Sequence, residues 1–406
     1  MKVLQINAVS GSGSTGSICA DIADALKSDG NEVKIVYGNG KSTYPDSVRV
    51  GSDLSVKVNA AYARISGLGG YFAPIETKKI IDIIKSFSPD IVHLHNLHAN
   101  YVNVHKLLRY LGENNIATVI TLHDCWFFTG KCTHYISESC KKWQSGCGKC
   151  PRLKNDIPSL FFDRTAKMWK DKKSDFEKIR NLAVIGVSDW ITGEAEKSFL
   201  KNAKIVKRIY NWVDLDVFNS RKKIDGENSS LGASSGEPNK FTIFCASAGW
   251  EKGTERFKDL LKLAEIIDPS MQIVAAGRFD EAVTLPPNVI KAGYIKDPAE
   301  LAEYYRNADV YVHLSRADTF GKVIAEAVAC GTPAIVYNAT ACPEIVSGDC
   351  GYAVKCGDIN AIVKKCEEIM HMGKKCFSEA CRASAERFNK DLLIKETVDV
   401  YKELLK

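Results

Sequence analysis

Short apolar runs alternate with amphipathic helical segments along this chain, and the alternation occurs twice. The apolar runs stand near residues 3–6, 90–96, 117–124 and 182–188, and again at 241–248, 271–277, 288–295, 309–315 and 333–338. Strands that alternate with helices in this way favour parallel sheets covered by helices on both faces. The sequence therefore predicts an α/β protein with two doubly wound, Rossmann-like domains.

The two halves are separated by a polar segment, 221–240, which predicts a mobile loop or linker. A length of 406 residues also suits two domains. We assign residues 1–212 to the first domain, with a cysteine-rich insertion at 125–158, and residues 213–388 to the second. Residues 389–406 predict a helix that packs back on the first domain. The apolar face expected for that helix comprises Leu392, Leu393, Val398, Tyr401, Leu404 and Leu405.

Composition narrows the function classes. No run approaches the roughly 18 apolar residues of a membrane span, and the chain does not start like a secretory signal. Fourteen cysteines without such a signal indicate a reducing cytoplasm. The net charge of +6 suits anionic ligands or an anionic membrane surface. Basic and aromatic residues do not interleave, so we expect no nucleic-acid partner.

Gly11, Gly13 and Gly16 form a G-x-G-x-x-G turn between an apolar run and a helical segment, where a helix N-terminus favours an anion. A nicotinamide enzyme would also carry an acid at the end of the second strand. That strand ends in Tyr37, Gly38 and Asn39 without a carboxylate. The neighbouring GNGKST stretch lacks the first glycine of a phosphate loop, because Ile35 stands there. A plain strand-to-helix turn is the simplest alternative.

The most informative stretch is 317–345, ADTFGKVIAEAVACGTPAIVYNATACPEI. Asp318 follows an apolar run, and Glu326 lies in a helix that opens at Gly321 or Lys322 and stops near Cys330. Both acids are thus placed at the carboxyl end of a parallel strand, where open α/β sheets bind ligands. Two carboxylates there can accept hydrogen bonds from sugar hydroxyls. The alternative is a capping acid followed by a solvated glutamate.

This stretch resembles the retaining nucleotide-sugar glycosyltransferases of family 4, which have the GT-B fold. Their signature, Glu-x7-Glu followed by an alanine-rich helix and G-T-P, reads D-x7-E here. The resemblance extends to YNWVDLDVF (210–218), to G-W-E-K-G (249–253) and to TLHD (121–124). It implies two Rossmann-like domains that face each other across a cleft, with the nucleotide held by the second domain. The glycine turn of the first domain would approach the donor diphosphate or the acceptor.

The resemblance also assigns roles. Glu326 is similar to the glutamate that binds the ribose diol, and Asp318 to the acid beside the transferred sugar. Lys252 resembles the lysine that neutralises the diphosphate, and His123 a histidine near the anomeric carbon. The remaining donor-site residues that the resemblance implies are Gly13, Arg278, Ile295, Thr319, Phe320 and Gly321. A leaving nucleoside diphosphate needs a cation and oriented N–H donors of this kind.

Two residues depart from the family pattern. Trp250 or Glu251 stands in the region where the family has an arginine, so one diphosphate cation is missing locally, with Arg278 or Lys322 as candidate substitutes. Asp318 is shorter than the family's glutamate by one methylene. Family members lack a clear protein nucleophile, so the resemblance implies positioning and electrostatic stabilisation, and no catalytic metal.

The insertion holds four cysteines, Cys132, Cys140, Cys147 and Cys150, spaced C-x7-C-x6-C-x2-C. A C-x2-C turn can present two thiolates to one ion, and two more thiolates would complete a structural zinc site. Free thiols, or disulfides formed on exposure to air, are the alternatives. His93, His95 and His98 also resemble a metal trio, but the family commonly has histidines here, and a packed or cleft-lining role is the interpretation that we favour.

The sequence thus indicates a retaining hexosyltransferase that uses a UDP-sugar or a GDP-sugar. The expected acceptor is a glycan or lipid-linked oligosaccharide of bacterial surface polysaccharide synthesis, at the inner face of the cell membrane. Residues 60–79 could contact an anionic membrane, although the same pattern suits an ordinary helix and loop over the sheet. The rival functions are a GT-B phosphorylase or epimerase and an inactive nucleotide-sugar-binding partner subunit.

Overall fold

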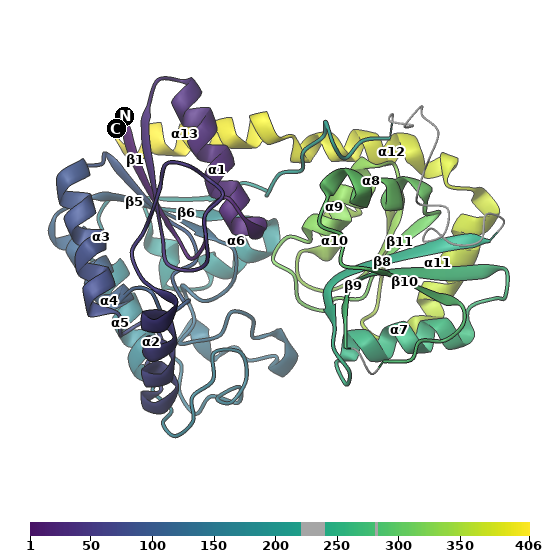
Figure 1. Ribbon diagram of the computed structural model, residues 1–406, viewed down its shortest axis with the longest axis horizontal. Coiled ribbons are helices and arrows are strands. Elements are labelled where there is room, and N and C mark those ends of the chain that lie inside the picture. The colour runs from purple at the N-terminus through teal and green to yellow at the C-terminus, as the bar shows by residue number, and fades with distance from the viewer. Residues whose placement is uncertain (221–239, 281–282) are drawn as a thin grey trace. The chain divides into compact units, whose positions relative to one another are not determined.

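The computed structural model describes residues 1–220, 240–280 and 283–406. The chain forms two compact units, one comprising Met1–Ile209 with Asp391–Lys406, the other Tyr210–Lys390 (Figure 1). The first boundary lies three residues before the 212/213 position expected from the sequence. The expected linker, 221–240, lies outside the described residues except for Lys240.

The first unit is built on a seven-stranded sheet in the order β3-β2-β1-β4-β5-β6-β7, and all its strand pairs are parallel. Its strands are β1 (Lys2–Asn7), β2 (Glu32–Tyr37), β3 (Ser47–Arg49), β4 (Ile91–Leu94), β5 (Ala117–Leu122), β6 (Leu182–Gly186) and β7 (Ile205–Arg208). Its main helices are α1 (Gly13–Ser28), α2 (Asp53–Ser66), α3 (Pro74–Phe87), α4 (Val104–Glu113), α5 (Thr165–Phe176) and α6 (Asp189–Glu196). The strands are nearly continuous apolar runs because helices cover both faces of such a sheet.

The C-terminal helix α13 (Lys390–Leu404) contacts the first unit through Tyr401, whose hydroxyl lies 2.6 Å from Nδ1 of the buried His93. Leu393, Val398, Tyr401 and Leu404 are buried as expected. Leu392 and Leu405, however, are 60% and 46% exposed, so their assignment to the apolar face is wrong. Leu392 precedes the buried Leu393 and is turned about 100° away from the buried face of α13, whereas Leu405 follows the last helical residue, Leu404.

The second unit has a six-stranded parallel sheet in the order β10-β9-β8-β11-β12-β13. Its strands are β8 (Phe241–Trp250), β9 (Met271–Phe279), β10 (Val289–Gly293), β11 (Val310–His313), β12 (Ala334–Tyr337) and β13 (Gly351–Val354). Its helices are α7 (Glu255–Ile266), α8 (Pro298–Asn307), α9 (Lys322–Ala329), α10 (Cys342–Ile345), α11 (Ile359–Met372) and α12 (Lys375–Ala385). The strand order reverses between β8 and β11, which places a ligand-binding switch point at their carboxyl ends.

None of the helices in the described part of the chain combines the length and the apolar character that a membrane-crossing segment requires.

Candidate functional site

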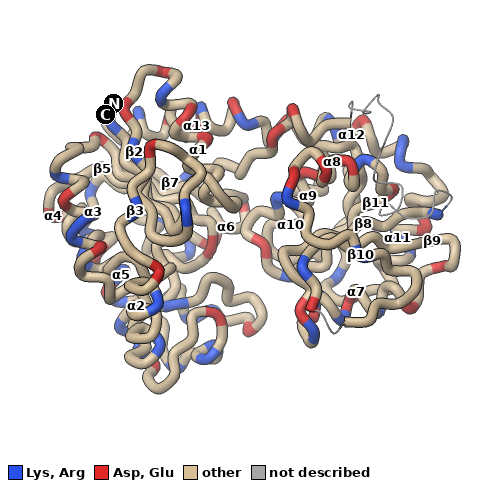
Figure 2. Tube along the Cα trace, in the orientation of Figure 1, with Lys and Arg blue, Asp and Glu red and all other residues tan. Residues whose placement is uncertain are grey.

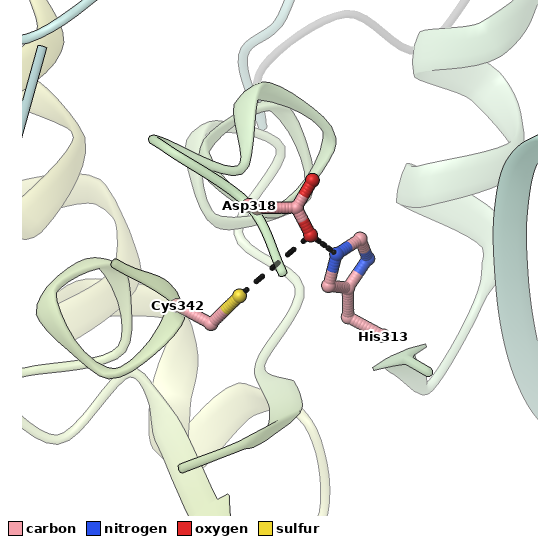
Figure 3. Close-up of side chains that lie close together, drawn as sticks. All are labelled: His313, Asp318 and Cys342. Atoms are coloured by element: carbon pink, nitrogen blue, oxygen red, sulfur yellow. Dashed lines mark hydrogen bonds and ion pairs between the residues drawn. The ribbon is translucent and has the colours of Figure 1, made fainter. Parts of the chain in front are cut away.

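Asp318 lies in the loop between β11 and α9, beside the switch point of the second sheet. Its Oδ2 is 2.7 Å from Nε2 of His313, the last residue of β11, and 3.8 Å from Sγ of Cys342 at the start of α10 (Figure 3). Its backbone N–H donates to Oγ1 of Thr340 at 3.0 Å. The carboxylate is therefore oriented by its neighbours, and it does not cap α9, whose N-cap is Gly321 without a side-chain hydrogen bond.

The surroundings of Asp318 favour its ionised form. Burial alone would raise the pKa of this carboxyl, but the charge of His313 and the hydrogen bonds from His313 and Ser315 outweigh it, with a further contribution from Arg256. The net pKa lies well below the usual range. An ionised carboxylate held in a fixed direction can accept hydrogen bonds from hydroxyl groups.

Glu326 lies one turn inside α9 and is only 6% exposed, which excludes the solvated glutamate considered from the sequence. Tyr305 donates its hydroxyl to Oε2 at 3.4 Å, and Nζ of Lys322 lies 3.9 Å from Oε1. Burial raises the pKa of Glu326 to about 7, although Lys322 and Tyr305 oppose that shift. The position thus holds a carboxyl group that is readily converted between its neutral and charged forms.

The loop between Asp318 and Glu326 is attached to the core by the side chain of Phe320. This ring is 2% exposed and packs edge-on against Phe388 at 5.4 Å, so its side chain belongs to the core and only its backbone is available to a ligand. Gly321 follows with φ +89°, and a Cβ there would lie 2.7 Å from Cδ1 of Ile324. Thr319 is half-buried. The sequence Thr319-Phe320-Gly321 therefore presents a constrained backbone at the mouth of α9.

Two basic residues and one apolar residue of the expected donor site follow or end three strands of the second unit. Lys252 is exposed in the turn after β8, and its backbone N–H donates to Asp280 at 3.0 Å. Arg278 stacks on Tyr294 with its guanidinium 4.6 Å from the ring centroid. Ile295, two residues beyond β10, is half-buried. These three residues share the edge of the sheet with Asp318, since each follows or ends a parallel strand.

Trp250, which stands where the family arginine is expected, is part of the core. Its indole is 1% exposed, and Nε1 donates to the carbonyl of Ala276 at 2.9 Å. Arg256, at the start of α7, instead supplies a cation that the sequence did not single out. It donates through Nη1 to Ser247, influences the pKa of Asp318, and has a buried Nε without a hydrogen-bond partner among the described residues.

Gly13 and His123, the two expected site residues of the first unit, lie at the carboxyl edge of the sheet of that unit. Gly13 begins α1 with φ +67°, exposed and with open space where a Cβ would stand. His123 follows β5, and its Nε2 lies 3.0 Å from Nδ1 of His95, whose Nε2 lies 3.2 Å from Oε1 of Gln5. Burial lowers the pKa of His123 to about 4, so the ring is neutral at pH 7.

His93, His95 and His98, the histidines that resemble a metal trio, bind other side chains of the first unit. His93 lies between the hydroxyls of Tyr401 and Thr121, and His98 pairs with Asp124 at 2.9 Å. Cys132, Cys140, Cys147 and Cys150 line a single cavity in the insertion of the first unit.

Sequence reasoning missed His313, Arg256 and Tyr305. His313 and Tyr305 bind the acids directly, and Arg256 influences Asp318 through its charge from a helix more than 60 residues earlier in the chain. His313 alone gave a signal, as a polar residue ending an apolar strand directly before the loop of Asp318.

Comparisons with known proteins agree with this geometry. Residues 15–217 match the model of the family described as Glycosyltransferase Family 4, and residues 232–387 match that of Glycosyl transferases group 1. The chain is 22% identical, over all of both chains, to the putative colanic acid biosynthesis glycosyl transferase WcaC of Escherichia coli.

Among solved structures, sucrose-phosphate synthase from Thermosynechococcus elongatus superposes with a TM-score of 0.70 at 16% identity, covering 99% of this chain and 98% of that one. Anabaena HepE in complex with UDP and glucose superposes with a TM-score of 0.63 at 16% identity, and 98% of each chain is covered. These similarities show a shared GT-B fold.

Proposed function

This chain belongs to glycosyltransferase family 4, and on that premise we propose that it transfers a hexose, with retention, from a nucleotide diphosphate sugar to a sugar hydroxyl. A UDP-sugar is the favoured donor, because the similarly folded HepE is seen with UDP and glucose; a GDP-sugar is the second choice. The proposed acceptor is a lipid-linked oligosaccharide of bacterial surface polysaccharide synthesis, which accords with the name of the relative WcaC.

The observation that carries the proposal is the buried carboxyl of Glu326 at the switch point of the second sheet. A ribose presents two neighbouring hydroxyls, and a carboxylate accepts hydrogen bonds from both. The hydroxyl of Tyr305 holds Oε2, and Lys322 lies beside Oε1. Ribose binding would replace the solvation that Glu326 lacks in the free protein and would favour its charged form.

Asp318 and the loop after it suit the transferred sugar. The carboxylate is ionised and oriented by His313, so it can accept hydrogen bonds from sugar hydroxyls without first losing a proton. The backbone N–H groups at the mouth of α9 are oriented donors for a phosphate or a hydroxyl. We assign Asp318 to positioning and electrostatic stabilisation, with the donor phosphate accepting the proton of the attacking hydroxyl on the same face.

The leaving diphosphate needs cations, and we propose Lys252 and Arg256 for this role. Nε of Arg256 is buried and has no hydrogen-bond partner in the part of the chain that the structure describes, and its Nη1 already donates to Ser247. A guanidinium can donate in parallel to two oxygens of a phosphate. Arg256 would therefore replace the arginine that the family carries near Trp250, and it does so from the next helix along the chain.

The proposal of a lipid-linked acceptor is supported by an exposed apolar face of α2. Tyr62, Ile65 and Leu54 are 57%, 49% and 72% exposed and follow helical spacing. The end of α2 is joined to the neighbouring loop by a hydrogen bond from Leu160 N–H to the Arg64 carbonyl, 2.8 Å long. That loop adds Phe161 and Phe162, which are 68% and 50% exposed.

Basic residues lie near this apolar face, and Figure 2 shows them together with acidic residues around α2. Lys57, Arg64 and Lys154 are exposed, and Arg164 stacks over Phe162 at 5.4 Å. Apolar side chains rimmed by lysine and arginine suit the surface of an anionic membrane. We propose that this face contacts the membrane that carries the lipid-linked acceptor.

A panel of UDP-, GDP- and other nucleotide sugars tests the donor proposal, with thermal shift and donor hydrolysis in the absence of acceptor as readouts. We expect UDP-sugars to stabilise the protein and to be hydrolysed slowly. A protein that is stabilised by nucleotide sugars but does not turn them over with any glycan acceptor would be the inactive binding subunit. Release of a sugar phosphate when inorganic phosphate is added would indicate a phosphorylase, and a changed donor sugar an epimerase.

Cosedimentation with vesicles tests the membrane proposal. We expect binding to vesicles that contain phosphatidylglycerol, weaker binding to phosphatidylcholine vesicles, and loss of binding in the Ile65→Ser, Phe161→Ser double variant. Val48→Ser, at another exposed apolar position, is the control. Equal binding by the wild type and the double variant would overturn the assignment of this face.

A further inference from the structure

The connection from β5 to α5 is long and nearly devoid of regular structure. It runs over residues 123–164, all of which the structure describes, and holds only two short 3-10 turns, Ile136–Glu138 and Lys142–Gln144. It is nevertheless packed: Trp143 is 1% exposed, and its ring centroid lies 4.9 Å from that of Phe128. Connections of this length are uncommon unless something other than a sheet or helix holds them.

Four cysteine side chains line one cavity in this lobe. Cys132, Cys140, Cys147 and Cys150 all line one cavity of about 20 Å³. A cavity needs roughly 10–15 Å³ to admit one water-sized sphere, so this one has room for a single ion. All four cysteines are free, and each is half-buried.

The backbone around the thiols is arranged to support sulfur ligands. Gly130 donates its N–H to Sγ of Cys147 at 3.2 Å, and a Cβ at Gly130 would lie 2.7 Å from the carbonyl oxygen of Thr165. The N–H of Cys150 donates to Asp163 at 2.6 Å. Cysteines from separate parts of the lobe thus line one cavity.

Lys131 is one of three basic residues that line the cavity, with Lys142 and Arg152, and its ammonium binds backbone carbonyls. Lys131 is 3% exposed, and its Nζ donates to the carbonyls of Arg152 and Asn155 at 2.8 and 2.7 Å. This ammonium therefore fixes the chain just after Cys150.

We propose that this lobe binds one structural zinc ion through Cys132, Cys140, Cys147 and Cys150. Thiolates are soft ligands that select zinc, and four of them form a closed tetrahedral site with no open position for catalysis. Each thiol that binds gives up its proton to solvent. Because the lobe follows His123 directly, the ion would stabilise the chain at the carboxyl edge of the first sheet.

Zinc binding requires the thiols to turn inward. Among the described residues, the set of three or more ligand atoms that all lie within 4.8 Å of one another comprises His313, Asp318 and Cys342, and does not include these four sulfurs. Rotation of the cysteine side chains, on a loop without regular structure, can bring the four sulfur atoms closer to one another. The set at Asp318 gives the test a second candidate position, which variants distinguish.

The test is the zinc content of the full-length protein purified under reducing conditions, measured by elemental analysis beside a count of reactive thiols. We expect about one zinc per chain in the wild type and less than 0.2 in Cys147→Ser and Cys150→Ser. Cys356→Ser and Cys376→Ser, at exposed cysteines outside the lobe, should keep the ion, as should Cys342→Ser. Chelation of the wild type should release zinc, expose four further thiols and lower the Tm.

Zinc far below one per chain in the wild type would overturn the proposal, whether the thiol count shows free cysteines or disulfides. Retention of zinc in Cys147→Ser and Cys150→Ser with its loss in Cys342→Ser would move the ion to Asp318 and equally overturn it. The wild-type measurement decides the question even where a serine variant fails to fold.

Discussion

Nε2 of His313 lies 2.7 Å from Oδ2 of Asp318, which joins the last residue of β11 to the acid of the following loop. Because an ionised carboxylate only accepts hydrogen bonds, Nε2 is the protonated nitrogen of the ring in this pair. His313 is thus a positioning residue: it fixes both the direction and the charge of Asp318.

Replacing His313 should move the pH dependence of transfer. In His313→Ala the pKa of Asp318 loses its principal downward influence while burial continues to raise it, so the acid limb of the kcat/KM profile should shift to higher pH. His313→Gln, which retains a donor, should restore part of the shift. An unchanged acid limb in His313→Ala would contradict this role.

Asp318→Ala should lower kcat/KM about 10²–10³-fold, whereas Glu367→Ala, at an exposed acid on α11, should not.

Glu326 should make stability depend on pH. The unfolded chain releases this proton near pH 4.5 and the folded protein near pH 7, so the folded state binds more protons between these values. Stability that is present below pH 4.5 is therefore lost as the pH rises to 7, by about 3 kcal/mol. Glu326→Gln should be more stable than the wild type at pH 8 and equal to it at pH 4.5. Denaturant titrations at pH 4.5 and pH 8 measure the free energy of unfolding of both proteins. The same difference between wild type and variant at the two pH values would contradict the prediction.

The same carboxyl should link donor binding to proton release. If the ribose favours the charged form of Glu326, donor affinity should rise as the pH increases towards 7 and then level off. Isothermal titration in two buffers of different ionisation enthalpy would show the released proton. Glu326→Gln should bind about 10–100-fold more weakly, in line with the loss of a charged hydrogen bond. It should also show no pH dependence of this kind.

Arg256 should act on the diphosphate more than on the fold. We expect Arg256→Ala to weaken binding of a nucleoside diphosphate and to lower kcat/KM by about 10²-fold, with Arg256→Lys intermediate because an ammonium cannot donate as a fork. Binding of the free nucleoside should change little. Arg382→Ala, at an exposed arginine on α12, is the matched control. Equal losses for nucleoside and nucleoside diphosphate would point to a folding defect instead.

Tyr401 should attach α13 to the first unit. Tyr401→Phe removes the hydroxyl that lies 2.6 Å from Nδ1 of His93 and leaves a buried ring nitrogen without its partner. We expect the variant to lose about 1–3 kcal/mol of unfolding free energy, while Tyr62→Phe, at an exposed tyrosine, loses almost none. Hydrogen exchange should locate the loss in α13 and β4. A change confined to other elements would show that this contact does not hold the helix.

The local pattern was enough to place α9, because glycine, proline and apolar spacing act within a few residues. The expected helix from Gly321 or Lys322 to near Cys330 agrees with the observed Lys322–Ala329. The same local signals could not place Arg256, which reaches the site because β8 and β11 are neighbours in the sheet. They also could not show that Trp250 is buried, since its indole partner is the carbonyl of Ala276 on the adjacent strand.

The exposure of a side chain was hardest to predict where the residue is next to the buried face of a helix. Leu392 and Leu405 look like core residues from hydropathy alone, but the turn of about 100° per residue carries Leu392 away from the buried side of α13, and Leu405 lies beyond the end of that helix. Glu326 gave the opposite case, since a glutamate in an alanine-rich helix suggests solvent, and the fold buries it.

A crystal structure with a bound nucleoside diphosphate tests the central claim most directly. The account predicts that both ribose hydroxyls lie within hydrogen-bond distance of the Glu326 carboxylate, with the diphosphate directed to Lys252 and Arg256. A nucleotide bound at the turn of Gly11 to Gly16, with its ribose away from Glu326, would contradict it.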